Sequence, residues 1–283
     1  MKILNGSELR DFIKERQAKQ VRALRQSWKV FPKLIILYLS QSPVIETYMR
    51  LKQQYGEDIL IDVEKKYVPF SGLEAAIKEA NEDELIHGII VQLPIEDSVG
   101  NVVSNDDILP IIDQIDPKKD VDGLTNGSLN SATATAINWL LAGYNVNLQG
   151  KKIAIIGQGI LVGLPLAKIW QTSGYDVTVF DINSSDEMRS KLSDFDIVVT
   201  ATGSPGLIKS DMLKQKAVVV DAGTASEGGK IKGDVDDSVR ESRNDLTITP
   251  KIGGVGPLTI AALMDNVIIA ARKIADQKGQ QDL

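Results

Sequence analysis

The chain has 283 residues with 38 acidic and 32 basic side chains, and its net charge of −6 argues against a nucleic acid or anionic membrane held by bulk electrostatics. It contains no cysteine, which excludes disulfides, a catalytic thiolate and cysteine-ligated zinc. The N-terminus lacks the apolar run of a signal peptide, and the apolar run at 34–39 is far shorter than a membrane span. We therefore expect a cytoplasmic soluble protein, and the length favours two compact lobes.

Helical and extended patterns alternate along the first part of the chain, which predicts an α/β lobe. Pro43 is expected in the first turn of a helix and Ser71 at the N-cap of another, while Pro110 is expected to bend or split a third. The predicted helices are 7–28, 43–55, 71–81 and 104–115, and the predicted strands are 33–40, 58–65 and 87–94.

The second part of the chain continues the alternation. A helix ends near residue 145, and 151–174 reads as strand, glycine turn and helix. A long helix with an apolar face follows near the C-terminus, and the tail after it is expected to fray. The further predicted elements are strands at 175–181, 195–203 and 216–223 and a helix at 256–277.

The glycine turn "GQGILVG" has glycines at 157, 159 and 163, directly after a buried strand and before a helix. Glycines let the backbone approach a pyrophosphate, and a helix N-terminus favours its negative charge. The spacing is one residue longer than the usual dinucleotide fingerprint, so a tight turn in another doubly wound fold is the alternative. The context favours an NAD or NADP site.

Asp181 ends the strand that follows this turn. A carboxylate there can accept hydrogen bonds from the ribose hydroxyls of NAD, and it would repel the 2′-phosphate of NADP. The alternative is an aspartate that caps a turn or helix. The residue type therefore favours NAD.

Tyr48 and Lys52 lie four residues apart and so share one face of a predicted helix. Such a pair is ordinarily a solvated face. The chain has a single histidine, His87, which matches no catalytic position and is expected to be structural or on the surface. Any acid–base chemistry must therefore come from another residue, and Lys52 is a candidate.

Four further motifs accompany Tyr48-x-x-x-Lys52 and the glycine turn: "VQLP" (91–94), "PKKDVDG" (117–123), "GDVD" (233–236) and "TPKIGGVGPLT" (249–259). In this order, over about residues 30–275, the chain resembles the methylenetetrahydrofolate dehydrogenase/cyclohydrolase family, the folate one-carbon enzymes of the FolD type. The short-chain dehydrogenases also use Tyr-x-x-x-Lys, but there the pair follows the nucleotide turn, and here it precedes it.

The resemblance implies a catalytic, folate-binding α/β lobe at 1–122, completed by the returning C-terminal helix 256–283, and a Rossmann NAD(P)-binding lobe at 123–255. It implies oxidation of 5,10-methylenetetrahydrofolate to the methenyl form with NAD(P)+ and hydrolysis to 10-formyltetrahydrofolate, a supply for purine biosynthesis. It further implies a homodimer formed through the nucleotide lobes, with folate as the small-molecule partner and no metal.

The resemblance makes Lys52 the catalytic lysine and Tyr48 its partner, with Gln92 and Asp122 completing the site. A carboxylate such as Asp122 can anchor the N–H groups of a reduced pterin, and Tyr48 can stack on it. Desolvation can lower the pKa of Lys52, so that a neutral amine acts on the water that attacks the methenyl carbon. Gln92 can hold the lysine without adding charge.

The resemblance also implies ligand contacts outside these four residues. In "GGVGPLT", Gly254 and Pro257 are assigned to the folate, with a flexible hinge as the alternative reading of the loop. The residues assigned to the cofactor are Gly157, Gln158, Gly159, Ile160, Gly163, Asp181, Thr202, Gly203 and Thr224.

The chain departs from the family pattern around the cofactor and the site walls. The segment after "KDVDG" is shortened, and the remaining differences are Ser131, Ala134 and Ala136 for two prolines and a glycine, Gly159 for serine, Asp181-Ile182 for His-Ser, Lys251-Ile252 for Val-Pro and Ile45 for serine. We interpret these changes as a shift of cofactor preference towards NAD. The alternatives are a paralogue with one of the two activities, another Rossmann dehydrogenase, and a non-catalytic nucleotide- or folate-binding protein.

Overall fold

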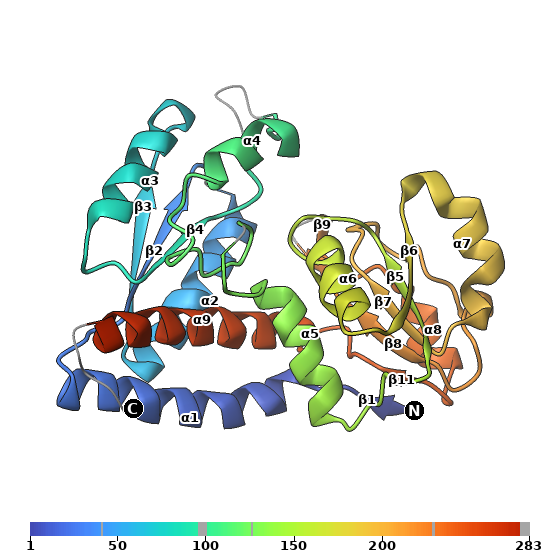
Figure 1. Ribbon diagram of the computed structural model, residues 1–283. Helices are drawn as coiled ribbons and strands as arrows, with labels where there is room; N and C mark the ends of the chain where they lie inside the picture. The colour runs from blue at the N-terminus through green and yellow to red at the C-terminus, as the bar shows by residue number, and fades with distance from the viewer. Residues whose placement is uncertain (41, 96–100, 126, 228–229, 278–283) are drawn as a thin grey trace. The chain divides into compact units, whose positions relative to one another are not determined.

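The computed structural model describes residues 1–40, 42–95, 101–125, 127–227 and 230–277 (Figure 1). The chain forms two compact units. Residues 1–10 and 133–259 make up the first, which we call the six-strand unit, and residues 11–132 with the chain from 260 onward make up the second, the three-strand unit.

The three-strand unit is built on a parallel sheet in the order β3-β2-β4. Leu34 to Leu37 of the central strand are buried, as expected for a strand covered on both faces. The strands are β2 (Lys33–Tyr38), β3 (Asp62–Tyr67) and β4 (Gly88–Val91), and the helices are α2 (Pro43–Ile59), α3 (Leu73–Glu82) and α4 (Asn105–Ile112). Most of α1 (Gly6–Ser27) and α9 (Val255–Gln277) belongs to this unit as well, although both helices begin in the six-strand unit.

Helices α1 and α9 lie side by side in this unit (Figure 1). The buried Gln17 of α1 donates from Nε2 to the carbonyl oxygen of Ala261 at 2.8 Å, and Tyr55 of α2 donates to Gln17 Oε1 at 2.8 Å. One buried amide therefore joins three helices, and this fixes α2, which carries Tyr48 and Lys52.

Helix α2 is longer than the sequence predicts, so the predicted strand at 58–65 is wrong in its first part. Ile45, Met49, Tyr55 and Ile59 are all buried, and this apolar periodicity carries the helix past residue 55. It ends at Leu60, whose left-handed φ of 67° closes the helix, and β3 begins at 62.

The starts of two helices test the predicted caps. Pro43 does occupy the first turn of α2, and the hydroxyl of Ser42 accepts from the Ile45 N–H at 3.3 Å. The prediction for Ser71 is wrong, because this residue lies in a 3₁₀ turn, η1 (Phe70–Gly72), and Gly72 is the N-cap of α3. Pro110 leaves α4 unbroken, and the helix ends two residues later.

The six-strand unit holds a parallel sheet in the order β1-β11-β8-β7-β5-β6. Strand β5 has β6 on one side and β7 on the other, which makes the carboxyl ends of these strands a topological switch point. The strands are β1 (Lys2–Ile3), β5 (Lys152–Ile156), β6 (Asp176–Phe180), β7 (Ile197–Thr200), β8 (Val218–Asp221) and β11 (Thr247–Ile248).

The remaining elements of this unit connect or flank the sheet. They are α5 (Ala132–Gly143), α6 (Gly163–Thr172), α7 (Ser185–Lys191), α8 (Asp237–Ser242), the antiparallel pair β9 (Ala225–Glu227) and β10 (Lys230–Lys232), and the 3₁₀ turns η2 (Ile182–Ser184), η3 (Leu192–Asp194) and η4 (Ser210–Met212).

The first ten residues belong to the six-strand unit, whereas the sequence analysis assigns them to the first lobe. The reason is that β1 pairs with β11, with Lys2 opposite Thr247. Strands of two residues carry no measurable alternation, so β1 and β11 could not be predicted.

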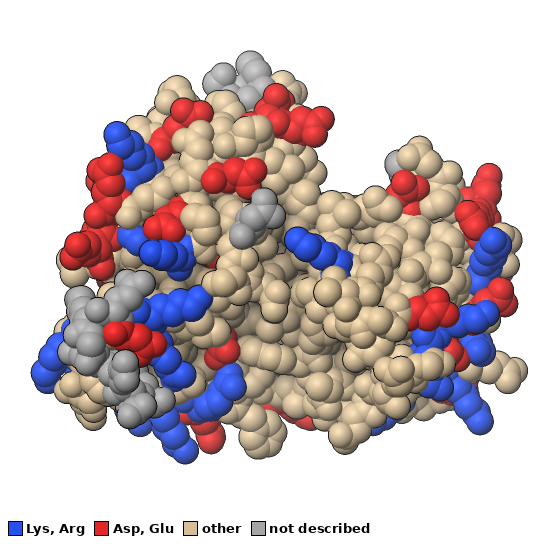
Figure 2. All heavy atoms as spheres, in the orientation of Figure 1, with Lys and Arg blue, Asp and Glu red and all other residues tan. Residues whose placement is uncertain are grey.

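On the face that Figure 2 shows, acidic and basic side chains are interspersed. Among the described helices, none combines the length and hydropathy that crossing a bilayer would require.

Candidate active site and cofactor site

The lysine of Tyr48-x-x-x-Lys52 contacts the glutamine of "VQLP" in the three-strand unit. Lys52 Nζ donates to Gln92 Oε1 at 2.8 Å. Gln92 follows β4, and its Nε2 donates to the carbonyl oxygen of Leu93 at 2.8 Å, which keeps its own oxygen turned towards the lysine. Tyr48 lies one helical turn before Lys52 and is half-buried. Two motifs 40 residues apart therefore meet.

Lys52 and Asp122 influence each other electrostatically. Desolvation lowers the pKa of Lys52 below its ordinary value, and the charge of Asp122 opposes this. Desolvation raises the pKa of Asp122, and the charge of Lys52 opposes that shift. In both residues desolvation favours the neutral form, and a lysine shifted in this direction is a better proton acceptor than an exposed one.

The side chain of Asp120 stabilises the turn that carries Asp122. Asp120 accepts from the Gly123 N–H at 3.0 Å with one carboxylate oxygen and from the Thr125 N–H at 2.7 Å with the other. Gly123 has a φ of 71°, and a Cβ there would lie 2.5 Å from the carbonyl carbon of Asn130. The tight return of the chain past Asn130 therefore requires glycine at 123.

Two buried polar residues anchor this loop to neighbouring helices. The buried Lys119 donates from Nζ to the carbonyl oxygens of Ala80, Asn81 and Asp83 at 3.0, 2.8 and 2.7 Å, at the end of α3. The sequence analysis missed Lys119, because its partners lie more than thirty residues away in the chain.

Asn266 of α9 is the second of these residues. It is 6% exposed, and its Nδ2 donates to the carbonyl oxygens of Val121 at 2.8 Å and Asn130 at 3.0 Å. In addition, the Ala132 N–H donates to the carbonyl oxygen of Asp122 at 3.2 Å. The segment that is shortened relative to the family is thus anchored at both of its ends, and the sequence analysis did not single out Asn266.

The glycine turn lies in the six-strand unit, directly after β5. Gly157 has a φ of 101°, and a Cβ there would lie 2.5 Å from the Ala201 carbonyl oxygen. Gly163 opens α6, and a Cβ there would lie 1.9 Å from the Gly157 carbonyl oxygen. Gly159 has open space, so the serine of the family pattern would fit there as well. Two of the three glycines are therefore required sterically, and the tight turn fits a pyrophosphate.

The other predicted cofactor residues follow the carboxyl ends of strands. Gln158 is exposed and Ile160 half-exposed after β5, Thr202 is half-exposed and Gly203 exposed after β7, and Thr224 is exposed after β8. Because the strands are parallel, these positions share one edge of the sheet. The residues present can therefore accommodate a dinucleotide along this edge.

Asp181 follows β6 and caps the turn η2. Its Oδ1 accepts from the N–H groups of Asn183 and Ser184 at 2.9 and 3.0 Å and from the Ser184 hydroxyl at 3.0 Å. The bond from the Ser184 hydroxyl is the main reason why the pKa of Asp181 is lowered. The capping role that the sequence left as an alternative is thus present, and it holds the carboxylate in its charged form.

The two remaining predicted folate residues, Gly254 and Pro257, lie in the six-strand unit, whereas Tyr48 and Asp122 lie in the three-strand unit. Pro257 is in the first turn of α9, as predicted. Just before it, the carbonyl oxygen of Gly253 accepts from the N–H of Gly6 at 2.9 Å.

In the part of the chain that the structure describes, no group of three or more acidic or histidine side chains is placed to bind a metal.

One unit has a doubly wound sheet with a glycine turn that sterics require, and the other is an α/β unit with a lysine whose pKa is lowered by desolvation. These features are typical of a dinucleotide-dependent enzyme. Comparison with known families agrees. The family model "tetrahydrofolate dehydrogenase/cyclohydrolase, catalytic domain" matches residues 4–122, and "tetrahydrofolate dehydrogenase/cyclohydrolase, NAD(P)-binding domain" matches residues 131–275. The chain belongs to this family.

Individual relatives extend over the whole length. The bifunctional protein FolD of Hydrogenobaculum sp. is 35% identical, over 96% of this chain and 99% of the relative. The crystal structure of the FolD dehydrogenase/cyclohydrolase of Campylobacter jejuni has a TM-score of 0.85 at 32% identity and covers 97% of this chain and 99% of that one. The Trypanosoma brucei enzyme, solved with NADP and an inhibitor, has a TM-score of 0.86 at 27% identity and covers 96% and 97%.

Proposed function

We propose that this protein oxidises 5,10-methylenetetrahydrofolate to the methenyl form with NAD(P)+ and then hydrolyses the methenyl form to 10-formyltetrahydrofolate. The hydrogen bond from Lys52 to Gln92, with the charge of Asp122 acting on the same lysine, carries the proposal. The proposed setting is one-carbon metabolism in the cytoplasm, where the formyl product supplies purine biosynthesis. In the proposed division of labour, the three-strand unit is the folate-binding lobe and the six-strand unit, which includes residues 1–10, is the cofactor lobe.

On the folate side, Asp122 anchors the pterin N–H groups and Tyr48 stacks on the ring. Loss of a hydride leaves positive charge on the one-carbon unit, so a neutral lysine is compatible with it where a charged lysine would repel it. Lys52 then takes the proton of the water that attacks the methenyl carbon. Gln92 holds the amine through an uncharged contact, and Gly254 and Pro257 complete the substrate site.

On the cofactor side, Gly157 and Gly163 leave room for the pyrophosphate, and the backbone around Gln158, Gly159 and Ile160 contacts it. When bound, NAD(P)+ supplies the hydride acceptor. Thr202, Gly203 and Thr224 contact the cofactor at the ends of β7 and β8. Asp181 accepts from the ribose hydroxyls and disfavours a 2′-phosphate, so NAD+ is the preferred cofactor.

A turnover assay tests the function. Purified protein is given 5,10-methylenetetrahydrofolate with NAD+ or NADP+, and reduced nicotinamide and the methenyl form are both followed. Reduction without accumulation of the methenyl form is expected, because the second step consumes it. Accumulation of the methenyl form would show a paralogue that has lost hydrolysis, and no reduction with either cofactor would reject the dehydrogenase.

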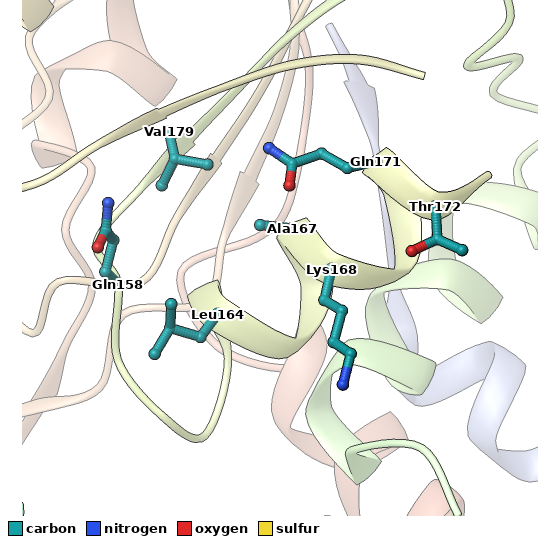
Figure 3. A pocket seen from close by; sticks show the side chains of 7 residues that line it. All are labelled: Gln158, Leu164, Ala167, Lys168, Gln171, Thr172 and Val179. Atoms are coloured by element: carbon teal, nitrogen blue, oxygen red, sulfur yellow. The ribbon is translucent and has the colours of Figure 1, made fainter. Parts of the chain in front are cut away.

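A homodimer formed through the six-strand unit is part of the proposal. Among the described strands, β6 pairs only with β5, so its outer edge is open. Beside it lies a groove of about 460 Å³, in which Val179 of β6 faces Ala167 and Gln171 of α6 (Figure 3). The groove is lined by Gln158, Leu164, Ala167, Lys168, Gln171, Thr172 and Val179.

An open edge beside an apolar groove suits a second copy of this chain, which would pair the strand and fill the groove. Leu164 is 46% exposed at this groove, so Leu164→Glu is expected to give monomers. Sedimentation analysis would measure this, with Leu85→Glu, an exposed position of the other unit, as the control. A wild-type monomer would reject the dimer.

A further inference from the structure

Asp234 of the "GDVD" motif is a fully buried carboxylate that binds the chain leaving β7. Its Oδ2 accepts from the Thr200 hydroxyl and from the Thr202 N–H, both at 2.7 Å. Its Oδ1 accepts from the Ser204 N–H at 2.9 Å. Its exposed fraction is 0%, so these three donors take the place of water around the carboxylate.

A second carboxylate supports the first. Asp221, at the end of β8, accepts from the backbone N–H groups of Asp234 and Val235 at 3.0 and 3.1 Å. Arg240 donates from Nη2 to Asp221 at 3.1 Å and from Nε to the carbonyl oxygen of Thr249 at 3.0 Å. The carboxyl ends of β7, β8 and β11 are therefore linked through two acidic side chains and one arginine.

The backbone packs so closely against the two carboxylates that only glycine fits at positions 223 and 233. A Cβ on Gly223 would lie 2.2 Å from Asp234 Oδ1, and a Cβ on Gly233 would lie 2.1 Å from Asp221 Oδ2. Both distances are far inside van der Waals contact. The carboxylates are thus enclosed by backbone, and their positions determine the course of the segments that they bind.

We propose that Asp234 is a positioning residue for the nicotinamide cofactor, because it sets the backbone of residues 202–204. This inference rests on the proposed function, in which Thr202 and Gly203 contact the cofactor. Asp234 acts through the loop and does not touch the cofactor itself. Two hydrogen bonds to backbone N–H groups, at residues 202 and 204, bracket Gly203, whose φ is 66°.

Asp234→Asn is the sharpest variant, because asparagine has the same shape. Each oxygen of Asp234 accepts from a backbone N–H, so either orientation of the amide places its NH₂ group against the N–H of Thr202 or of Ser204. The loop must then move. Thr200→Val is a milder second variant, since it removes one donor and keeps the strand.

The test separates cofactor binding from folate chemistry. NAD+ and NADP+ affinity is measured by calorimetry, and hydrolysis of methenyltetrahydrofolate is measured without nucleotide. Asp234→Asn is expected to weaken nucleotide binding about tenfold while hydrolysis stays within about twofold. Thr200→Val is expected to give a smaller loss of about threefold. The control is Asp194→Asn, an exposed aspartate of the same unit, which should leave both readouts unchanged.

The outcomes distinguish this inference from the proposed function. If wild-type protein turns over and both variants bind nucleotide as wild type does, the positioning role is wrong and the function stands. A parallel loss of binding, hydrolysis and thermal stability would also overturn it, since Asp234 would then serve folding alone. If wild-type protein binds nucleotide without turnover, the proposed function fails and the calorimetry still decides the role of Asp234. Wild-type protein that binds neither nucleotide would overturn both.

Discussion

The two units shield charged side chains from water in different ways. In the three-strand unit, desolvation lowers the pKa of Lys52 and raises that of Asp122, and we propose that Lys52 exchanges a proton during the reaction. In the six-strand unit, Asp234 accepts three hydrogen bonds and Asp221 is paired with Arg240, so both carboxylates are held in place. The comparison contrasts a half-buried pair that we propose takes part in chemistry with enclosed carboxylates that fix a backbone.

The largest expected effect is on Lys52, since it alone is proposed to move a proton. Lys52→Met is expected to reduce methenyl hydrolysis by about a hundredfold or more, because general base catalysis typically contributes that much. A stopped assay of 10-formyltetrahydrofolate measures it. Lys78→Met, an exposed lysine on α3, is the control. If Lys52→Met hydrolysed the methenyl form at the wild-type rate, Lys52 would not be the base, and the proposed chemical role of the charges in the three-strand unit would be wrong.

The second prediction concerns Asp122, whose charge raises the pKa of Lys52 against the desolvation that lowers it. Hydrolysis needs the neutral amine, so in wild type the rate rises with pH and levels off below 10.5, the ordinary pKa of lysine. Asp122→Asn removes the opposing charge, so the pKa of Lys52 falls and the rise moves to lower pH. The KM for folate is also expected to increase about tenfold as the pterin loses its anchor.

The pH–rate profile of hydrolysis, corrected for the reaction without enzyme, measures this shift. Asp113→Asn, on the exposed end of α4, serves as the control. A rise that moves to higher pH in Asp122→Asn would mean that the carboxylate does not act on Lys52.

The third prediction concerns Asn266, which holds a loop of the three-strand unit through backbone carbonyl oxygens, as Asp234 holds a loop of the six-strand unit through backbone N–H groups. Asn266→Leu leaves the carbonyl oxygens of Val121 and Asn130 without their donor, at a cost of about 1–3 kcal/mol in the free energy of unfolding. The KM for folate is expected to rise several-fold while nucleotide affinity stays unchanged. Urea unfolding and steady-state kinetics measure the two effects. If Asn266→Leu weakened folate and nucleotide binding equally, the segment that Asn266 holds and the segment that Asp234 holds would not act independently.

The residues that the sequence analysis identified are those whose signal is local. The four-residue spacing of Tyr48 and Lys52 and the glycines at 157 and 163 can be read within one turn of chain, and the structure shows why both glycines are needed. Most of the longer strands and helices were likewise predictable from periodicity, whereas the boundary at Leu60, the cap of α3 and the two-residue strands β1 and β11 were not.

The residues that it missed act over long separations. Asn266 binds carbonyl oxygens 136 and 145 residues earlier, and Asp234 binds donors 30 to 34 residues earlier. Asp234 lies in the "GDVD" motif, but neither its role nor that of Asn266 could be assigned, because the function of a buried amide or carboxylate is recognisable only once its partners are known. The pairing of β1 with β11 was unpredictable for the same reason.

The smallest expected effect is on cofactor choice. Asp181 already caps η2 through Oδ1, so its other oxygen is the one proposed to meet the ribose. Asp181→Ser removes the charge that repels a 2′-phosphate and retains a hydroxyl that can cap the turn. The ratio of kcat/KM for NAD+ to that for NADP+ is expected to fall about three- to tenfold, which is the scale of one screened surface charge. Asp176→Ser, at the exposed start of β6, is the control. Because serine lacks the charged carboxylate that accepts from Asn183 and Ser184, a small loss of thermal stability should accompany the change. An unchanged ratio with that loss alone would make Asp181 a capping residue only.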